Sequence, residues 1–103
     1  MAAYKLKITI YADQDLNDVY LEGFESWGIE QADKYYDDLI RHFDRLCENP
    51  FLFRAVDEVR EGYRRSVCGR HSIYYRINGD IVEIMGVLKR QNPFKHLPEN
   101  PDR

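Results

Sequence analysis

The sequence predicts an α+β domain in which a helical hairpin packs on a four-stranded, mainly antiparallel sheet, in the chain order β-α-α-β-β-β. Three observations predict this fold. Residues 61–88 are rich in β-branched and aromatic side chains around two turn signals, which is typical of three strands joined by hairpins. Residues 12–48 carry apolar side chains at three- and four-residue spacing, interrupted at Gly28, which indicates two helices. Residues 4–11 alternate apolar and polar side chains, which indicates a strand with one buried face.

The first strand is expected to lie at an edge of the sheet, beside the last strand. Its apolar residues, from Tyr4 to Ile10, fall on the buried face. Lys5 and Lys7 fall on the wet face, where lysines discourage pairing with other chains.

The first helix is expected over residues 12–27, with Asp13 as its N-cap and Gly28 as a left-handed residue just past its end. Trp27 is interpreted as a core anchor at the helix junction. The predicted apolar stripe consists of Leu16, Val19, Tyr20, Phe24 and Trp27. The predicted polar side consists of Asp15, Asp18, Glu22 and Glu25.

The second helix is expected over residues 29–48 and ends at Asn49-Pro50, because proline disfavours helix in the residue before it. The short connection at Gly28 makes the two helices antiparallel neighbours. Its predicted apolar stripe consists of Ala32, Tyr35, Tyr36, Leu39, Ile40, Phe43, Leu46 and Cys47.

Two turns define the hairpins. Asn78-Gly79 favours a two-residue type I′ turn, because both central residues then need a positive φ. Gly69 supplies the permissive backbone for the other turn, and His71 is expected to be a hydrogen-bonded strand residue beside it.

Composition bounds the class of protein. With 103 residues, 44% of them hydrophobic, the chain predicts one packed domain over 1–103 with a flexible C-terminal tail over about 90–103. No apolar run approaches the ~18 residues of a membrane span, and no signal peptide is recognisable, so a cytoplasmic location is expected. Cys47 and Cys68 lack metal-ligand spacing and are expected to be free thiols.

Charge is unevenly distributed along the chain. The net charge is −3, which argues against general affinity for nucleic acid. Residues 12–53 hold eleven acidic and three basic residues, whereas residues 54–76 hold six arginines and three acidic residues. The acidic segment and the basic one therefore suit partners of opposite character.

An ordered series of short motifs resembles the ParE toxins of the RelE/ParE superfamily, the toxin halves of bacterial type II toxin–antitoxin pairs. The resemblance covers nearly the whole chain, and the family's β-α-α-β-β-β fold agrees with the predicted one. The motifs are Ala12-x-x-Asp15-Leu16, Trp27-Gly28-x-x-Gln31-Ala32, Leu46-x-x-Asn49-Pro50, Gly62-Tyr63-Arg64, His71-Ser72-Ile73-Tyr74-Tyr75-Arg76 and Ile84-x-x-Val87-Leu88. Many ParE-like chains read Ile-Leu-His-Gly/Arg where this chain reads Val87-Leu88-Lys89-Arg90.

The resemblance implies a toxin that blocks religation by DNA gyrase, serves plasmid stabilisation, needs no cofactor or metal and performs no chemistry of its own. It implies a ParD-like antitoxin that wraps across the toxin, no membrane partner, and no sequence-specific DNA binding except through the antitoxin complex. The residues expected to bind the antitoxin are Tyr20, Tyr36, Phe43, Phe51, Arg64, Arg65 and Arg76. Those expected to contact gyrase are Lys89, Arg90, Phe94, Lys95 and His96.

The alternative function is a ribosome-dependent mRNA endonuclease of the RelE type. Attack by a 2′-OH needs a base, an acid and cations that stabilise charge on the phosphate. His71 and His96 are the candidate proton carriers, but no tyrosine lies beyond Tyr75. The candidate cations are Arg60, Arg64, Arg65, Arg70, Arg76, Lys89, Arg90 and Lys95. A third possibility is a toxin fold that is retained only to form the antitoxin complex, with little residual toxicity. Phe94 and Leu97 either fold back on the domain or form an exposed apolar contact.

Overall fold

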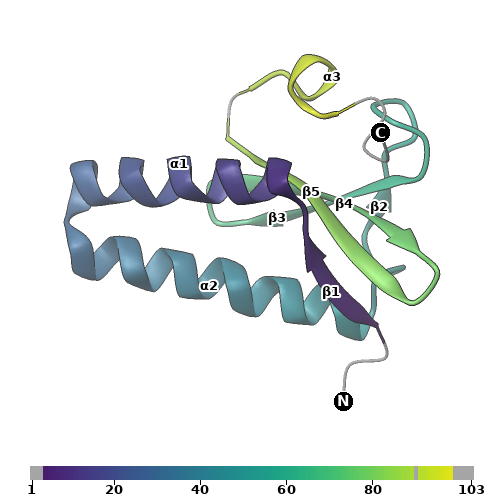
Figure 1. Cartoon of the computed structure of the whole chain (residues 1–103), viewed down its shortest axis with the longest axis horizontal. Coiled ribbons are helices and arrows are strands. Elements are labelled where there is room, and N and C mark those ends of the chain that lie inside the picture. The colour runs from purple at the N-terminus through teal and green to yellow at the C-terminus, as the bar shows by residue number, and fades with distance from the viewer. Residues whose placement is uncertain (1–3, 90, 99–103) are drawn as a thin grey trace.

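The computed structural model describes residues 4–89 and 91–98 and shows a helical hairpin packed on a mixed, five-stranded sheet (Figure 1). This confirms the predicted α+β fold, with one strand more than expected. The elements are β1 (Lys5–Ile8), α1 (Ile10–Trp27), α2 (Ile29–Glu48), β2 (Arg54–Ala55), β3 (Tyr63–Cys68), β4 (His71–Asn78), β5 (Ile81–Leu88) and α3 (Pro93–His96). Within the described residues, no helix combines the length and the apolar character that crossing a membrane requires.

The strands lie in the order β1-β5-β4-β3-β2, so β1 lies beside the last strand and at an edge, as predicted. It pairs in parallel with β5, from Lys5 opposite Ile81 to Ile8 opposite Ile84. The unpredicted strand, β2, is only two residues long and pairs with β3 at the other edge. All remaining pairs are antiparallel.

The turn between β4 and β5 differs from the prediction. Asn78 pairs with Ile81, so the two loop residues are Gly79 and Asp80. Gly79 has a φ of 62°, whereas Asn78 and Asp80 have no positive φ, which excludes the type I′ turn at Asn78-Gly79. A positive φ at the first loop residue alone is the sign pattern of a type II′ turn. The β3–β4 turn has the same pattern at Gly69, with a φ of 59°.

Helix α1 begins two residues earlier than predicted, at Ile10. Its N-cap is Thr9, whose hydroxyl accepts a hydrogen bond from the Ala12 amide at 3.3 Å, so the prediction of Asp13 as N-cap is wrong. The same hydroxyl donates to the Ile84 carbonyl at 2.7 Å. Thr9 therefore ends β1, starts α1 and ties both to β5.

The hairpin of α1 and α2 covers one face of the sheet (Figure 1). Helix α2 has the bounds and the buried stripe that the sequence predicts, and Gly28, with a φ of 88°, joins the helices. The largest fully buried side chains of this core include Leu16, Leu39, Phe43, Leu46, Ile73, Tyr75 and Ile84.

A second, smaller core consists of Val56, Tyr63, Tyr74, Met85, Leu88 and Leu97. Because Tyr74 alternates with Ile73 and Tyr75 along β4, this core lies on the opposite face of the sheet. A bulge beside Tyr74 and Tyr75 places Gly86 opposite Tyr74. A Cβ at Gly86 would lie 2.5 Å from Cδ2 of Leu97, so Leu97 packs directly against the glycine and would have to shift to make room for a side chain there.

The C-terminal segment over residues 93–98 packs on the domain, where the sequence led us to expect a flexible tail. Leu97 is 2% exposed, and Arg60 donates hydrogen bonds to the carbonyls of Phe94 and Leu97 at 2.6 and 3.1 Å. The Tyr63 hydroxyl donates to the Pro98 carbonyl at 3.3 Å. Of the predicted tail, residues 90 and 99–103 lie outside the described residues.

Candidate functional site

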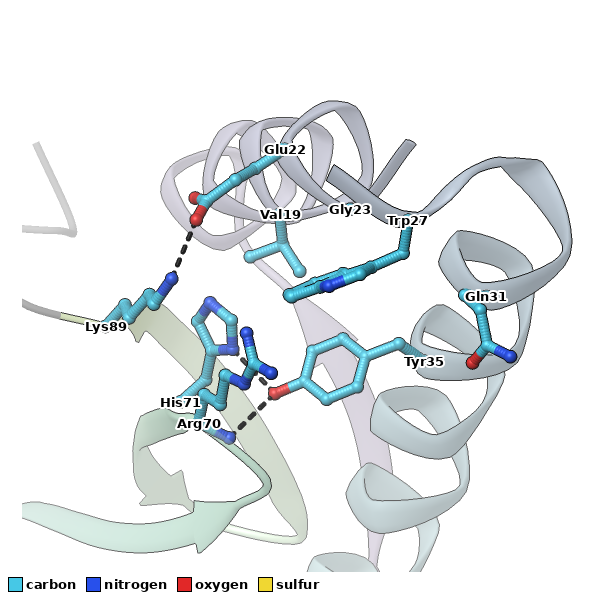
Figure 2. A pocket seen from close by; sticks show the side chains of 9 residues that line it. All are labelled: Val19, Glu22, Gly23, Trp27, Gln31, Tyr35, Arg70, His71 and Lys89. Atoms are coloured by element: carbon cyan, nitrogen blue, oxygen red, sulfur yellow. Dashed lines mark hydrogen bonds and ion pairs between the residues drawn. The ribbon is translucent and has the colours of Figure 1, made fainter. Parts of the chain in front are cut away.

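A cavity of about 270 Å³ opens between the helical hairpin and the β3–β4 turn (Figure 2). Its apolar walls come from α1, its floor from α2 and the turn, and its mouth from charged side chains. The lining residues are Val19, Glu22, Gly23, Trp27, Gln31, Tyr35, Arg70, His71 and Lys89.

Trp27 is half exposed, at 48%, so the prediction that it anchors the core is wrong. Figure 1 shows the reason: the end of the hairpin projects beyond the sheet, so the last turn of α1 has no strand beneath it. Phe24, also predicted in the buried stripe, is likewise 48% exposed. The Trp27 indole instead forms a wall of the cavity, and the guanidinium of Arg70 lies 4.2 Å from the indole centroid.

The Tyr35 hydroxyl holds the floor of the cavity to the β3–β4 turn. It donates to the Cys68 carbonyl at 3.1 Å, accepts from the Arg70 amide at 3.0 Å, and lies 2.7 Å from Nδ1 of His71. All three contacts are satisfied together when a neutral His71 carries its proton on Nδ1. Gly69 is required here, because a Cβ would lie 2.7 Å from the Tyr35 ring.

His71 is only 6% exposed and is a hydrogen-bonded strand residue, as predicted. Burial lowers its pKa, and the positive charge of Lys89 lowers it further. The Lys89 ammonium forms an ion pair with Glu22 at 2.7 Å across the mouth of the cavity. The neutral imidazole therefore joins the turn to α2.

Asp15, predicted on the polar side of α1, is 5% exposed. Its Oδ2 accepts the Val87 amide at 3.0 Å, and its Oδ1 lies 2.8 Å from Nε2 of His96. The prediction failed because these partners lie 72 and 81 residues away in the chain. The described residues contain no group of three or more side chains that could hold a metal ion.

The four aromatic residues predicted to bind an antitoxin are dispersed. Tyr20 and Tyr36 meet edge to face across the hairpin, with ring centroids 6.0 Å apart. Phe51 lies beyond the end of α2 and is 57% exposed. Phe43 is fully buried in the first core, so it stabilises the fold and offers no surface to a partner.

The three arginines predicted to bind an antitoxin divide between the faces of the sheet. Arg64 donates to the Phe53 carbonyl at 2.6 Å and stacks on the Phe51 ring at 5.1 Å. Arg65 faces the other way and donates to the Ser72 hydroxyl at 3.0 Å, so the prediction of opposite faces is confirmed. Arg76 pairs with the buried Glu83 at 2.7 Å.

Four of the five residues predicted to contact a target lie near the second core and the cavity. Phe94 is 53% exposed on α3, Lys95 is exposed beside it, and Lys89 lines the cavity. His96 reaches back to Asp15. Arg90 lies outside the described residues.

Sequence reasoning missed the cavity itself. Its residues come from α1, α2, the β3–β4 turn and the end of β5. The available signals were two: an aromatic residue beside a helix-ending glycine at Trp27-Gly28, and an arginine following a turn glycine at Gly69-Arg70. Neither predicts that the two side chains stack.

The chain matches the family described as "ParE toxin of type II toxin-antitoxin system, parDE" over residues 6–94. It belongs to the ParE toxin family. Toxin ParE1 of Mycobacterium tuberculosis is 33% identical over 81 residues, which cover 78% of this chain and 83% of that one. Toxin ParE1 of Caulobacter vibrioides is 36% identical over 87 residues, which cover 84% and 90%.

A solved structure described as "Chromosomal ParDE TA system from P. aeruginosa" shares the fold of this ParE-family chain. The TM-score is 0.76 at 21% sequence identity, over 86% of this chain and 98% of that one. The ParE match ends at residue 94, within α3, so it includes the start of the packed C-terminal segment and leaves residues 95–98 beyond it.

Proposed function

We propose that this ParE-family toxin inhibits DNA gyrase in the cytoplasm, stabilises the replicon that carries it, and is neutralised by a ParD-like antitoxin. The family match over residues 6–94 carries the proposal. As a ParE toxin, the chain is one component of a type II toxin–antitoxin system, and such a component requires an antitoxin partner.

The proposed action is binding, without chemistry by the toxin. A general base must reach the proton that it abstracts. His71 is buried and bonded to Tyr35, so it is engaged within the fold, whereas the His96 side chain is 38% exposed with its Nε2 on Asp15. The burial of His71 removes one of the two candidate proton carriers from contact with a substrate, which favours gyrase inhibition over the mRNA endonuclease alternative.

The surface proposed for gyrase is α3. The two hydrogen bonds from Arg60 fix the α3 backbone, and Leu97 anchors its end in the second core. Phe94 is therefore held outward at 53% exposure with Lys95 beside it. A rigid apolar side chain next to a cation loses little entropy on binding, which is a property of interface anchors.

The surface proposed for the antitoxin includes the half-buried Tyr20 and Tyr36 of the hairpin, the exposed Phe51 that follows it, and the basic segment 54–76. Phe51 is exposed and carries the stacked Arg64 guanidinium. An amphipathic antitoxin segment would cover such apolar rings and place carboxylates near the arginines.

The test uses purified toxin freed of antitoxin, mixed with gyrase, ATP and plasmid. Loss of supercoiling with accumulation of linear DNA is the expected result. Phe94→Ala should reduce the effect at least about tenfold if Phe94 is an interface anchor. Leu52→Ala is the matched control, since Leu52 is 69% exposed, apolar and outside α3.

Failure of the proposal has a defined outcome. If gyrase activity is unchanged, the same preparation is added to translating ribosomes. Cleaved message would establish the endonuclease alternative, and intact message would leave a toxin fold that serves the antitoxin complex.

A further inference from the structure

The cavity beside Trp27 leaves apolar surface of the described residues uncovered. Val19 and Gly23 are buried behind it, whereas the Trp27 indole is 48% exposed at its wall. Figure 2 shows the indole facing the Tyr35 ring and the β3–β4 turn across the open space. No described side chain of this chain fills that space.

The volume suits one side chain of a partner. An engineered apolar cavity of about 150 Å³ accepts a benzene molecule. At about 270 Å³, this cavity therefore has room for a side chain the size of leucine or phenylalanine. A single water molecule needs far less space, and apolar walls bind water poorly.

Arg70 gives the mouth of the cavity a preference for negative charge. Its guanidinium lies over Trp27, and among the described residues it forms no ion pair. Lys89, in contrast, is already paired with Glu22. A planar guanidinium with free donors binds a carboxylate in a bidentate geometry.

The contacts within this chain hold the cavity in shape without a partner. The Tyr35 hydroxyl fixes the turn through Cys68, Arg70 and His71, and Gly69 permits the close approach of the Tyr35 ring. Arg70 thus leaves a turn whose backbone is held at both ends. Preorganisation of this kind lowers the entropic cost of binding.

We propose that this cavity receives one apolar side chain of the antitoxin, while a carboxylate of the same segment binds Arg70. The inference rests on the proposed antitoxin partner and names its chemistry. Nucleic acid is the less suitable occupant, because the two helices that line the cavity are acidic. Residues 12–53, which include nearly all of both helices, hold eleven acidic and three basic residues.

The first test uses a small probe that combines the two required groups. Trp27 is the only tryptophan of the chain, so its fluorescence and its indole N–H signal report directly on the cavity. 3-Phenylpropionate should shift both signals saturably. Neutral 3-phenylpropanamide and ring-free propionate should bind at least about tenfold more weakly, since each lacks one group.

Arg70→Gln should weaken binding of 3-phenylpropionate about tenfold and leave binding of the amide unchanged. Arg41→Gln is the matched control, because Arg41 is exposed, pairs with Asp38 and lies outside both the cavity and the basic segment 54–76. Equal binding of acid and amide would overturn the role of Arg70. No saturable shift, or tighter binding of oligothymidine than of the acid, would overturn the proposal.

The second test measures the toxin–antitoxin dissociation constant by titration calorimetry. Arg70→Gln should raise it about tenfold, mainly through faster dissociation, and Arg41→Gln should not. An unchanged constant for Arg70→Gln would overturn the inference and leave the proposed function standing. If the antitoxin fails to bind the unaltered toxin, the proposed function is overturned. The antitoxin is then also excluded as the occupant of the cavity, whether or not the small probe binds there.

Discussion

Replacing Leu97 by alanine tests whether the C-terminal segment is part of the folded domain. Leu97 is 2% exposed, contacts the second core and fills the space above Gly86. Loss of a buried leucine side chain costs ~2–5 kcal/mol of unfolding free energy. Because the four-residue α3 can relax toward the space left behind, we expect a loss of about 2–3 kcal/mol.

The assay is urea denaturation followed by circular dichroism, with the slope against urea checked for two-state behaviour. For a chain of this size the expected loss lowers Tm by about 10–20 °C. Phe94→Ala is the control, because Phe94 lies on the same helix but is 53% exposed, and it should cost under ~0.5 kcal/mol. Equal stability of the two variants would refute the anchoring of residues 93–98 by Leu97.

Three further perturbations test the turn and the buried charges. Gly69→Ala should lower the unfolding free energy by about 2–3 kcal/mol, because the new Cβ would meet the Tyr35 ring. Gly79→Ala should lower it by only about 1 kcal/mol, because Gly79 has a φ of 62° but a Cβ there would have no neighbour within 4 Å. Equal losses in the two variants would contradict the close approach of Gly69 to Tyr35. Burial, aided by the positive charge of nearby Lys89, lowers the pKa of His71, so the NMR titration of His71 should have a midpoint below 6.5. The contribution of His71 to stability should decline as pH falls below 6.5. A midpoint above 6.5 would contradict the lowered pKa. Burial raises the pKa of Glu83, but the hydrogen bonds and ion pairs of this carboxylate outweigh burial and lower the pKa overall. Glu83→Gln should therefore lower the unfolding free energy by about 2–3 kcal/mol at pH 7, and by progressively less as pH falls below about 4.5. A loss independent of pH would refute this prediction.

The elements that the sequence predicts well are those with local signals at both ends. Helix α2 has the predicted bounds because Gly28 and Asn49-Pro50 stand at the two ends of a continuous apolar stripe. The start of α1 has no such local signal. Thr9 continues the strand alternation, and its capping role depends on the Ile84 carbonyl, 75 residues away.

The same reasoning accounts for the turn and the missed strand. Asn-Gly is a strong local turn signal, but a register in which Asn78 pairs with Ile81 shifts the loop by one residue. Strand β2 has two exposed residues and exists only by pairing with β3. Pattern reasoning sees neither, because both depend on the partner strand.

The candidate site was predictable in residue types but not in arrangement. The sequence indicated that Arg64 and Arg65 face opposite ways, because strand alternation is local. It could not place Arg70 over Trp27, since that contact needs the hairpin to project over the β3–β4 turn. Phe43 was assigned to a groove because helical periodicity does not distinguish a buried position from its half-buried neighbour.

The histidines determine how activity losses in this protein should be interpreted. His42 lies 2.7 Å from the Ser66 hydroxyl, His71 lies 2.7 Å from the Tyr35 hydroxyl, and His96 lies 2.8 Å from the Asp15 carboxylate. Each contact joins segments far apart in the chain, so replacing any of them disturbs the fold as well as removing a titratable group.

A loss of toxicity in a His96 variant would therefore not by itself indicate catalysis. His96 and Leu97 hold the same helix, α3, to the domain through different chemistry. If α3 acts by binding, Leu97→Ala should reduce toxicity as His96→Gln does, although it removes no proton carrier. If His96 acts as an acid or base, only the histidine variant should change the pH dependence of the chemical step, whereas Leu97→Ala should lower its rate without changing that dependence.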